Sequence, residues 1–169
     1  MILDTTMLHS PIGPLTLLAR DGVLVGLEFE NRHGPGAERW PHLARHLGSF
    51  ETREHADPAG AATRLTRYFD GDLGALDEQP VEFHGTEFQL AIWLALRTIP
   101  VGTTWTYGEI AARIGRPAAV RAAGAANGAN PVAIVVPCHR VIAADGTLWG
   151  YGGGLDRKRW LLGHEGVRS

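Results

Sequence analysis

Residues 106–128 read TYGEIAARIGRPAAVRAAGAANG and predict two short helices joined by a tight turn. Thr106 and Glu109 have the spacing of a capping box, in which a threonine and a glutamate three residues later close the first helical turn. Gly115-Arg116-Pro117 then breaks the chain, and we expect a second helix from Pro117 to Gly128, since proline favours helix starts and glycine helix ends. Two helices connected in this way are typical of a helix-turn-helix.

The second helix of this pair consists almost entirely of alanine and glycine, and Arg121 is its one long side chain. A recognition helix in the DNA major groove normally presents several long polar side chains. A thin helix can instead lie in a narrow groove, where Arg121 would reach a phosphate or take the place of an extruded base. The alternative is an alanine-rich helix packed in the protein interior, with Arg121 at its surface.

The only cysteine of the chain follows this pair, in residues 130–142, which read NPVAIVVPCHRVI. A cysteine acts as a nucleophile in its thiolate form, which needs a nearby proton acceptor or positive charge. His139 would accept the proton directly or through a water, and Glu165, at the end of the last expected helix, is the carboxylate that we expect to support it. The alternative is that Cys138 is an inert buried thiol.

Four blocks of the sequence occur in a distinctive order. They are Thr106-Tyr107-Gly108-Glu109-Ile110-Ala111, Asn130-Pro131 with Pro137-Cys138-His139-Arg140-Val141, Gly150-Tyr151-Gly152-Gly153-Gly154, and Trp160-Leu161-Leu162 with His164-Glu165-Gly166. With these blocks the chain resembles the O6-alkylguanine-DNA alkyltransferases, strongly over residues 84–166 and weakly elsewhere. The resemblance implies repair of O6-alkylguanine, and of O4-alkylthymine, in double-stranded DNA. The alkyl group would pass to the protein once, without a cofactor.

The resemblance also implies roles for individual residues. Cys138 would attack the alkyl carbon, and His139, a water and Glu165 would remove the thiol proton. Asn130 would brace the active-site turn, and Tyr107 would protonate the departing guanine. Arg121 would fill the gap left by the flipped base. The other DNA contacts would be Ala119, Ala122, Ala126 and Thr106, and the base pocket would be lined by Tyr151, Gly152, Gly153 and Val136.

The loop around Tyr151 bears on the size of the alkyl group. Three residues without Cβ atoms, Gly152 to Gly154, leave space beside the thiol, so we expect ethyl and benzyl groups to be accepted. An inward-turned indole of Trp149 would occupy the same space. Trp149 and Trp105 are departures from the family pattern.

Residues 1–80 predict a small α/β domain, for which the resemblance implies a ribonuclease-H-like fold. Met7–His9, Leu15–Ala19 and Val23–Phe29 are the expected strands of an antiparallel meander. A connector follows from residue 31 to 57, with a short helix at 40–47, and Asp57-Pro58 opens a helix that ends at Gly71. Residues 81–169 predict a mostly helical domain that begins with a helix over 87–98, after a capping box of Thr86 and Gln89. The expected class is therefore α+β.

The charge of the chain is unevenly distributed. The first 80 residues carry 7 basic and 12 acidic residues and the remainder 9 basic and 6 acidic, for a net charge of −2 over 169 residues. The C-terminal half is therefore the one expected to face phosphates. A single cysteine excludes an internal disulfide and multi-cysteine metal sites, and no apolar run reaches membrane length. We expect a cytoplasmic monomer. We also expect no metal site, because His42 and His46, four residues apart, are too few ligands for one.

Two other functions remain open on the sequence. A cysteine hydrolase would use Cys138 and His139 on acyl substrates, and it would need an oxyanion hole. A binding module, either a helix-turn-helix regulator or a sensor of alkylated DNA, would hold the base without repairing it. Sensors of that kind typically lack the cysteine that this chain has.

Overall fold

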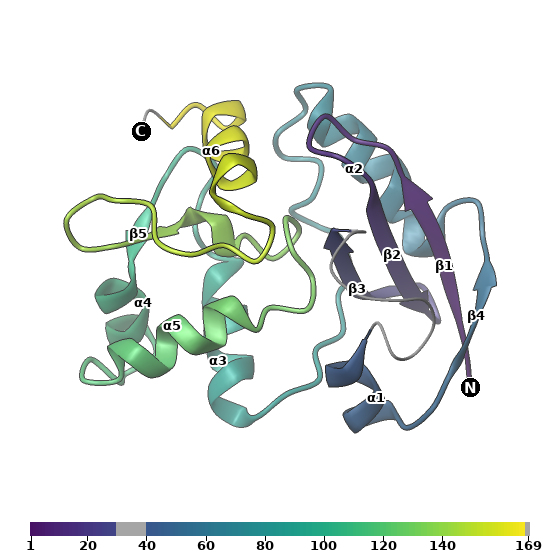
Figure 1. Cartoon of the computed structure of the whole chain (residues 1–169), viewed down its shortest axis with the longest axis horizontal. Helices are drawn as coiled ribbons and strands as arrows, with labels where there is room; N and C mark the ends of the chain where they lie inside the picture. The colour runs from purple at the N-terminus through teal and green to yellow at the C-terminus, as the bar shows by residue number, and fades with distance from the viewer. Residues whose placement is uncertain (30–39, 168–169) are drawn as a thin grey trace. The chain divides into compact units, whose positions relative to one another are not determined.

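The computed structural model describes residues 1–29 and 40–167 and divides into two compact units, Met1–His84 and Gly85–Ser169 (Figure 1). The first unit combines a sheet with helices and the second is mostly helical, which confirms the expected α+β class. Residues 31–39 of the expected connector lie outside the described residues. None of the helices in the described part of the chain has the length and apolar character that a membrane crossing requires.

The N-terminal unit contains a four-stranded sheet of order β3-β2-β1-β4 (Figure 1). Its strands are β1 (Ile2–Leu8), β2 (Leu15–Arg20), β3 (Val23–Phe29) and β4 (Glu51–Glu54). The first three pair antiparallel, as the expected meander requires, whereas β4 pairs parallel to β1. The sheet is therefore mixed.

Two strand predictions are corrected by the structure. The first strand begins at Ile2 and not at Met7, because Asp4, Thr5 and Thr6 hide the apolar alternation although Leu3 is fully buried. The strand β4 was expected to be connector, because all four of its side chains are polar and exposed. An edge strand without a buried face has no hydrophobic period to detect.

One helix of this unit lies between β3 and β4 in sequence, and the other helical segments follow β4. In chain order, the helical segments are α1 (Pro41–Leu47), the short 3-10 turn η3 (Pro58–Gly60) and α2 (Ala61–Phe69). Asp57 was expected to open a regular helix, but the turn η3 comes first. The Asp57 carboxylate instead accepts hydrogen bonds from the backbone N–H groups of Ala62 and Thr63 at the start of α2.

The residue before α1, Trp40, packs closely on Gly26 of β3. A Cβ added to Gly26 would lie 2.5 Å from the Trp40 ring, so a larger residue does not fit there.

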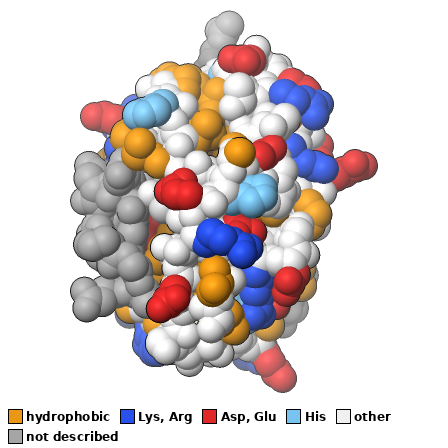
Figure 2. Space-filling model, turned by 90° about the vertical axis from the view of Figure 1, so that its right-hand side faces the viewer, with side chains coloured by type: hydrophobic (Ala, Val, Ile, Leu, Met, Phe, Trp, Pro, Cys, Tyr) orange, Lys and Arg blue, Asp and Glu red, His pale blue; other side chains and the backbone are white. Residues whose placement is uncertain are grey.

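Charged side chains of both signs are mixed on the face that Figure 2 shows, which is the side of the molecule where Figure 1 labels β1 and β4. The N-terminal unit also forms ion pairs between opposite charges, including Arg53 with Asp4 at 2.8 Å and Arg67 with Asp72 at 2.5 Å. A mixed surface of this kind does not attract a polyanion.

The C-terminal unit contains four α-helices in its described residues. They are α3 (Glu87–Leu96), α4 (Tyr107–Arg113), α5 (Val120–Gly128) and α6 (Leu155–His164). Between them lie the two-stranded sheet of β5 (Trp105–Thr106) and β6 (Val141–Ile142) and the 3-10 turn η4 (Cys138–Arg140). Both expected capping boxes are present, at Thr86 with Gln89 and at Thr106 with Glu109.

Two helix boundaries differ from the prediction. Helix α3 ends at Leu96 and not at Thr98, and α5 begins at Val120 and not at Pro117. In place of a first helical turn at Pro117, the N–H of Ala119 donates to the carbonyl of Arg116 in a separate turn. Ala119, with a φ of −90° and a ψ of 41°, is the non-helical cap residue, so the helix begins only after it.

Candidate functional site

Cys138 lies in a buried, clamped segment of the C-terminal unit. Cys138 is 6% exposed and is the first residue of the turn η4. The side chain of Asn130 fixes the loop before it, since its amide donates to the carbonyl of Val136 at 2.7 Å and its oxygen accepts from the N–H of Val132 at 3.0 Å. Asn127, at the end of α5, donates to the carbonyl of Cys138 at 3.3 Å. The position of the thiol is thus set by two asparagines.

Within the same loop Ile134 adopts a φ of 72°. A β-branched residue in the left-handed region is strained, and such strain persists only where surrounding contacts impose it. Ile134 is 1% exposed, and Val132 and Val136, two residues before and after it, are fully buried. Packing and the asparagine clamp therefore hold the backbone before Cys138 in a conformation that it would not adopt alone.

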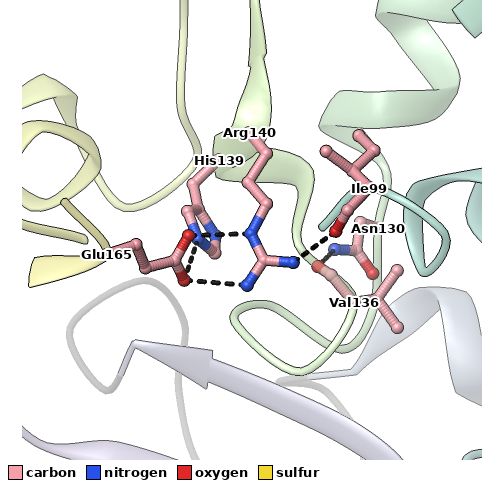
Figure 3. A network of polar contacts seen from close by, with 6 residues as sticks. All are labelled: Ile99, Asn130, Val136, His139, Arg140 and Glu165. Carbon is pink, nitrogen blue, oxygen red and sulfur yellow. Dashed lines mark hydrogen bonds and ion pairs between the residues drawn. The ribbon is translucent and has the colours of Figure 1, made fainter. Parts of the chain in front are cut away.

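His139 and Arg140, the two residues that follow the cysteine in the chain, converge on the carboxylate of Glu165 (Figure 3). The distance from Nε2 of His139 to Oε2 of Glu165 is 2.9 Å. Arg140 donates two hydrogen bonds to the Glu165 carboxylate, from Nε to Oε1 at 2.7 Å and from Nη2 to Oε2 at 2.9 Å. Its Nη1 donates to the carbonyl of Ile99 at 2.6 Å. All three side chains are buried, so this is an ion pair and a hydrogen-bonded histidine inside the protein.

The network sets the charge of each member. Burial alone would raise the pKa of Glu165, but the hydrogen bonds from His139 and Arg140 outweigh it and hold the pKa well below its ordinary value. Burial lowers the pKa of His139, and the hydrogen bond to Glu165 offsets this only in part. At neutral pH the carboxylate is ionised and the imidazole is neutral. Nε2 then carries the proton that the carboxylate accepts, and Nδ1 is the basic nitrogen.

Lys158, the only lysine of the chain, is a buried cation in α6. Its ammonium donates to the carbonyl of Val141 at 2.7 Å and to that of Trp149 at 2.9 Å. Burial lowers the pKa of Lys158 to about 8, and the negative charge of a Cys138 thiolate acts in the opposite direction. The lysine therefore connects three segments and brings a positive charge into the electrostatic reach of the thiol.

A cavity of about 610 Å³ opens beside these residues. Helix α5 and the loop after β6 form most of its wall, with Tyr107 from the start of α4. The lining residues are Tyr107, Val120, Arg121, Gly124, Ala125, Asn127, Gly128, Trp149, Gly150, Tyr151 and Gly152. Cys138 is not among them, but Asn127 contacts both the cavity and the cysteine carbonyl. Burial raises the pKa of Tyr107, and a thiolate at Cys138 raises it further, so the hydroxyl keeps its proton.

The structure brings some of the expected site residues together and separates others. Cys138, His139, Glu165 and Asn130 form one cluster, and Tyr107, Arg121, Tyr151 and Gly152 lie on the cavity. Gly153 and Val136 do not line that cavity. Ala122 is exposed and Ala119 is half-buried, whereas the hydroxyl of Thr106 accepts the N–H of Glu109 in the helix cap.

Ala126 was expected to contact DNA, but its side chain is buried. Its carbonyl accepts the indole N–H of Trp93, a fully buried residue of α3, at 2.8 Å. Ala126 therefore lies on the face of α5 that packs inside the unit.

Three residues of the site were not assigned a role from the sequence: Arg140, Lys158 and Asn127. A signal existed for each. Arg140 belongs to the Pro-Cys-His-Arg block, Lys158 is a single lysine among arginines, and Asn127 is the one amide in an alanine-rich helix. None of these signals identifies the hydrogen-bond partner of the residue. Asn127 and Lys158 donate to backbone carbonyls, and Arg140 donates to Glu165, which lies 25 residues further along the chain.

The histidines His42 and His46 lie in the N-terminal unit, with ring centroids 4.8 Å apart. Nε2 of His42 contacts the carbonyl of His84. Among the residues that the structure describes, no group of three or more His, Cys, Asp or Glu side chains is arranged to hold a metal ion.

Comparison with known families gives two matches that together span nearly the whole chain. Residues 3–83 match the ribonuclease-like domain of 6-O-methylguanine DNA methyltransferase, and residues 87–167 match its DNA binding domain.

Individual relatives agree with these matches. The methylated-DNA–protein-cysteine methyltransferase of Shigella flexneri is 51% identical over 162 residues, covering 93% of this chain and 92% of the relative. The Salmonella typhimurium protein of the same name is 46% identical over 158 residues, with coverages of 93% and 92%. Among solved structures, Mycobacterium tuberculosis OGT in complex with DNA superposes with a TM-score of 0.77 at 43% identity, covering 98% of this chain and 92% of that one.

Replacing Arg140 with methionine is expected to lower the free energy of unfolding by about 3–5 kcal/mol, because a buried carboxylate and the carbonyl of Ile99 lose their donors. Arg159→Met is the matched control. It removes an exposed ion pair with Asp156 in α6, which is expected to cost less than about 1 kcal/mol. Chemical denaturation measures both, and equal losses would contradict the importance of the buried pair.

The acid stability of the protein is expected to depend on Glu165. Its pKa in the folded state is below the ordinary value of 4.5, so the unfolded chain binds its proton more readily. The carboxylate therefore stabilises the fold above about pH 4.5, and this contribution is lost as the pH falls through that value towards the folded pKa. Urea denaturation between about pH 6 and pH 3 should show a steeper loss in the parent than in Glu165→Gln. Parallel curves would refute this assignment.

Proposed function

Since the chain belongs to the 6-O-methylguanine DNA methyltransferase family, we propose that it transfers the alkyl group of O6-alkylguanine in double-stranded DNA to Cys138. As a methylated-DNA–protein-cysteine methyltransferase, it binds DNA and repairs it. The observation that carries the proposal for Cys138 is the buried pair of His139 and Glu165 directly beside the only cysteine of the chain. That arrangement supplies a base to a thiol that would otherwise be inert.

Activation of the thiol begins at Nδ1 of His139. This nitrogen is buried and has no hydrogen-bond partner within the protein, while Nε2 is held by Glu165. The thiol proton passes to Nδ1, directly or through a water, and the ionised carboxylate stabilises the imidazolium that forms. The ammonium of Lys158 favours the thiolate by its charge.

The transfer itself is a displacement at the alkyl carbon. A bond forms between this carbon and Sγ of Cys138 as the bond from the carbon to O6 breaks. The electron pair of the broken bond stays on guanine, which takes a proton from the hydroxyl of Tyr107. Solvent then returns the proton held by His139 to the tyrosinate, so that the products are a thioether and neutral guanine. The thioether is not hydrolysed, so each chain reacts once.

A base inside a duplex cannot reach a cysteine that is 6% exposed, so the nucleotide must leave the stack. The cavity beside Tyr107 and Tyr151 offers the space, and Arg121 lies at its wall on α5. We place α5 in the minor groove, where its exposed residues Arg121 and Ala122 allow close approach and the guanidinium fills the gap left by the base. O4-alkylthymine has the same alkyl–oxygen bond and is a second substrate of this chemistry.

The site lies within one unit of one chain, which supports action as a monomer. A cysteine hydrolase is disfavoured by the backbone around the thiol. The N–H groups of Cys138 and Arg140 donate to the carbonyls of Val136 and Pro137, so neither points to an oxyanion. The nucleophilic cysteine in turn disfavours a sensor that only binds.

Titration with a duplex that contains O6-methylguanine tests the proposal. Transfer is expected to stop at one methyl group per chain, and intact mass should place it on Cys138. Cys138→Ser should abolish transfer and leave DNA binding largely intact, because the exposed surface of α5 is unchanged. Turnover beyond one equivalent would exclude the suicide reaction.

Arg121→Ala should slow repair of the duplex more than transfer from the free modified base, since the free base needs no help to leave a stack. Rates on the two substrates measure the difference. Arg116→Ala, which removes an exposed arginine in the turn before α5 and outside the cavity wall, is the control for loss of charge alone. An equal loss on both substrates in Arg121→Ala would contradict the role inside the duplex.

A further inference from the structure

Trp149 is a large apolar side chain that is left in solvent at the wall of the cavity. It is 67% exposed, whereas Trp40, Trp93 and Trp105 are buried and Trp160 is half-buried. An isolated exposed apolar residue needs no explanation, but this one borders the cavity that also contains Tyr107, Arg121 and Tyr151. The indole therefore does not fill the cavity in this structure.

The backbone of Trp149 is fixed although its side chain is exposed. Its carbonyl accepts hydrogen bonds from the hydroxyl of Tyr107 at 3.4 Å and from the ammonium of Lys158 at 2.9 Å. These donors belong to α4 and α6, so two helices determine where the loop carries the indole. A loop whose backbone is already held in this way loses little conformational freedom when its side chain binds a ligand.

We propose that the indole of Trp149 packs against the nucleotide that enters the cavity and covers it during alkyl transfer. This inference rests on the proposed function, and it adds a binding residue to the site. Bases stack on aromatic side chains without regard to sequence, because every base has a π-face. Burial of the exposed indole against the base removes apolar surface of both partners from water.

The surroundings indicate the nucleotide and not the phosphate backbone as the partner. The cavity wall next to Trp149 consists of Gly150, Tyr151 and Gly152, which carry no charge. The charged group of the wall is Arg121, which comes from α5. The two side chains therefore contact different parts of the DNA. The guanidinium of Arg121 contacts the duplex, and the indole of Trp149 contacts the extruded base.

Acrylamide quenching of tryptophan fluorescence tests this directly in Cys138→Ser protein, where the complex does not react. Without DNA, Trp149 should dominate the quenching, and the same protein with Trp149→Phe gives the background. A duplex with O6-methylguanine should protect Trp149, and the same duplex with unmodified guanine should not. Equal protection by both duplexes, or none, overturns the proposal. Failure of the damaged duplex to bind at all, followed by anisotropy of a labelled strand, would instead overturn the proposed function.

Transfer rates give an independent measure. Trp149→Ala should slow transfer from the damaged duplex by roughly 10-fold, the loss of one stacking contact, and Trp149→Phe should keep most of the rate because a ring remains. Leu94→Ala is the matched control, since it removes an apolar side chain that is 59% exposed on α3 and outside the cavity wall. Rates in Trp149→Ala equal to those of Leu94→Ala would overturn the proposal.

Discussion

The carboxylate of Glu165 is the constraint on which the C-terminal unit depends. It follows α6 directly, and through Arg140 it reaches both the turn that carries Cys138 and the carbonyl of Ile99 after α3. A buried ion pair does not by itself make a fold more stable than an apolar core would. The ion pair instead fixes the geometry of the unit, because three donors from His139 and Arg140 hold the carboxylate in one orientation. The reactive turn is thereby held against the end of the last helix.

The same constraint orders the charges around the thiol. With Arg140 neutralising Glu165, the carboxylate stays ionised without forcing His139 to be protonated, and burial keeps the imidazole neutral. A neutral imidazole with one nitrogen held by a carboxylate is a base poised to receive one proton. Lys158 adds a positive charge that an ionised cysteine favours. In the proposed reaction Arg140 thus contributes to the chemistry of Cys138 through Glu165 and His139.

The sequence predicted the parts of the fold that local patterns encode, and missed those that depend on distant partners. The capping boxes of Thr86 and Thr106 are local, and both were correctly located. The strand β4 pairs with the first part of β1, residues 2–5, and no periodicity in either segment shows this pairing. In the site, the blocks around Cys138 pointed to His139 and Glu165. Lys158 was missed because its hydrogen-bond partners are backbone carbonyls, which any sequence supplies.

The alanine-rich composition of α5 follows from its position between two surfaces. One side packs inside the unit, where Ala123 and Ala126 are buried and Trp93 donates to the helix backbone. The other side faces the cavity, where a Cβ on Gly124 would lie 3.7 Å from the ring of Tyr107. Larger residues on the first side would separate α5 from α3, and on the second they would fill the cavity in which we propose that an extruded base is held. The interior interpretation of this helix therefore holds for the face that carries Ala123 and Ala126, and the groove interpretation stays a proposal for the face that carries Arg121. Arg121 is the exception, because its proposed role in the duplex requires a side chain that reaches beyond the helix.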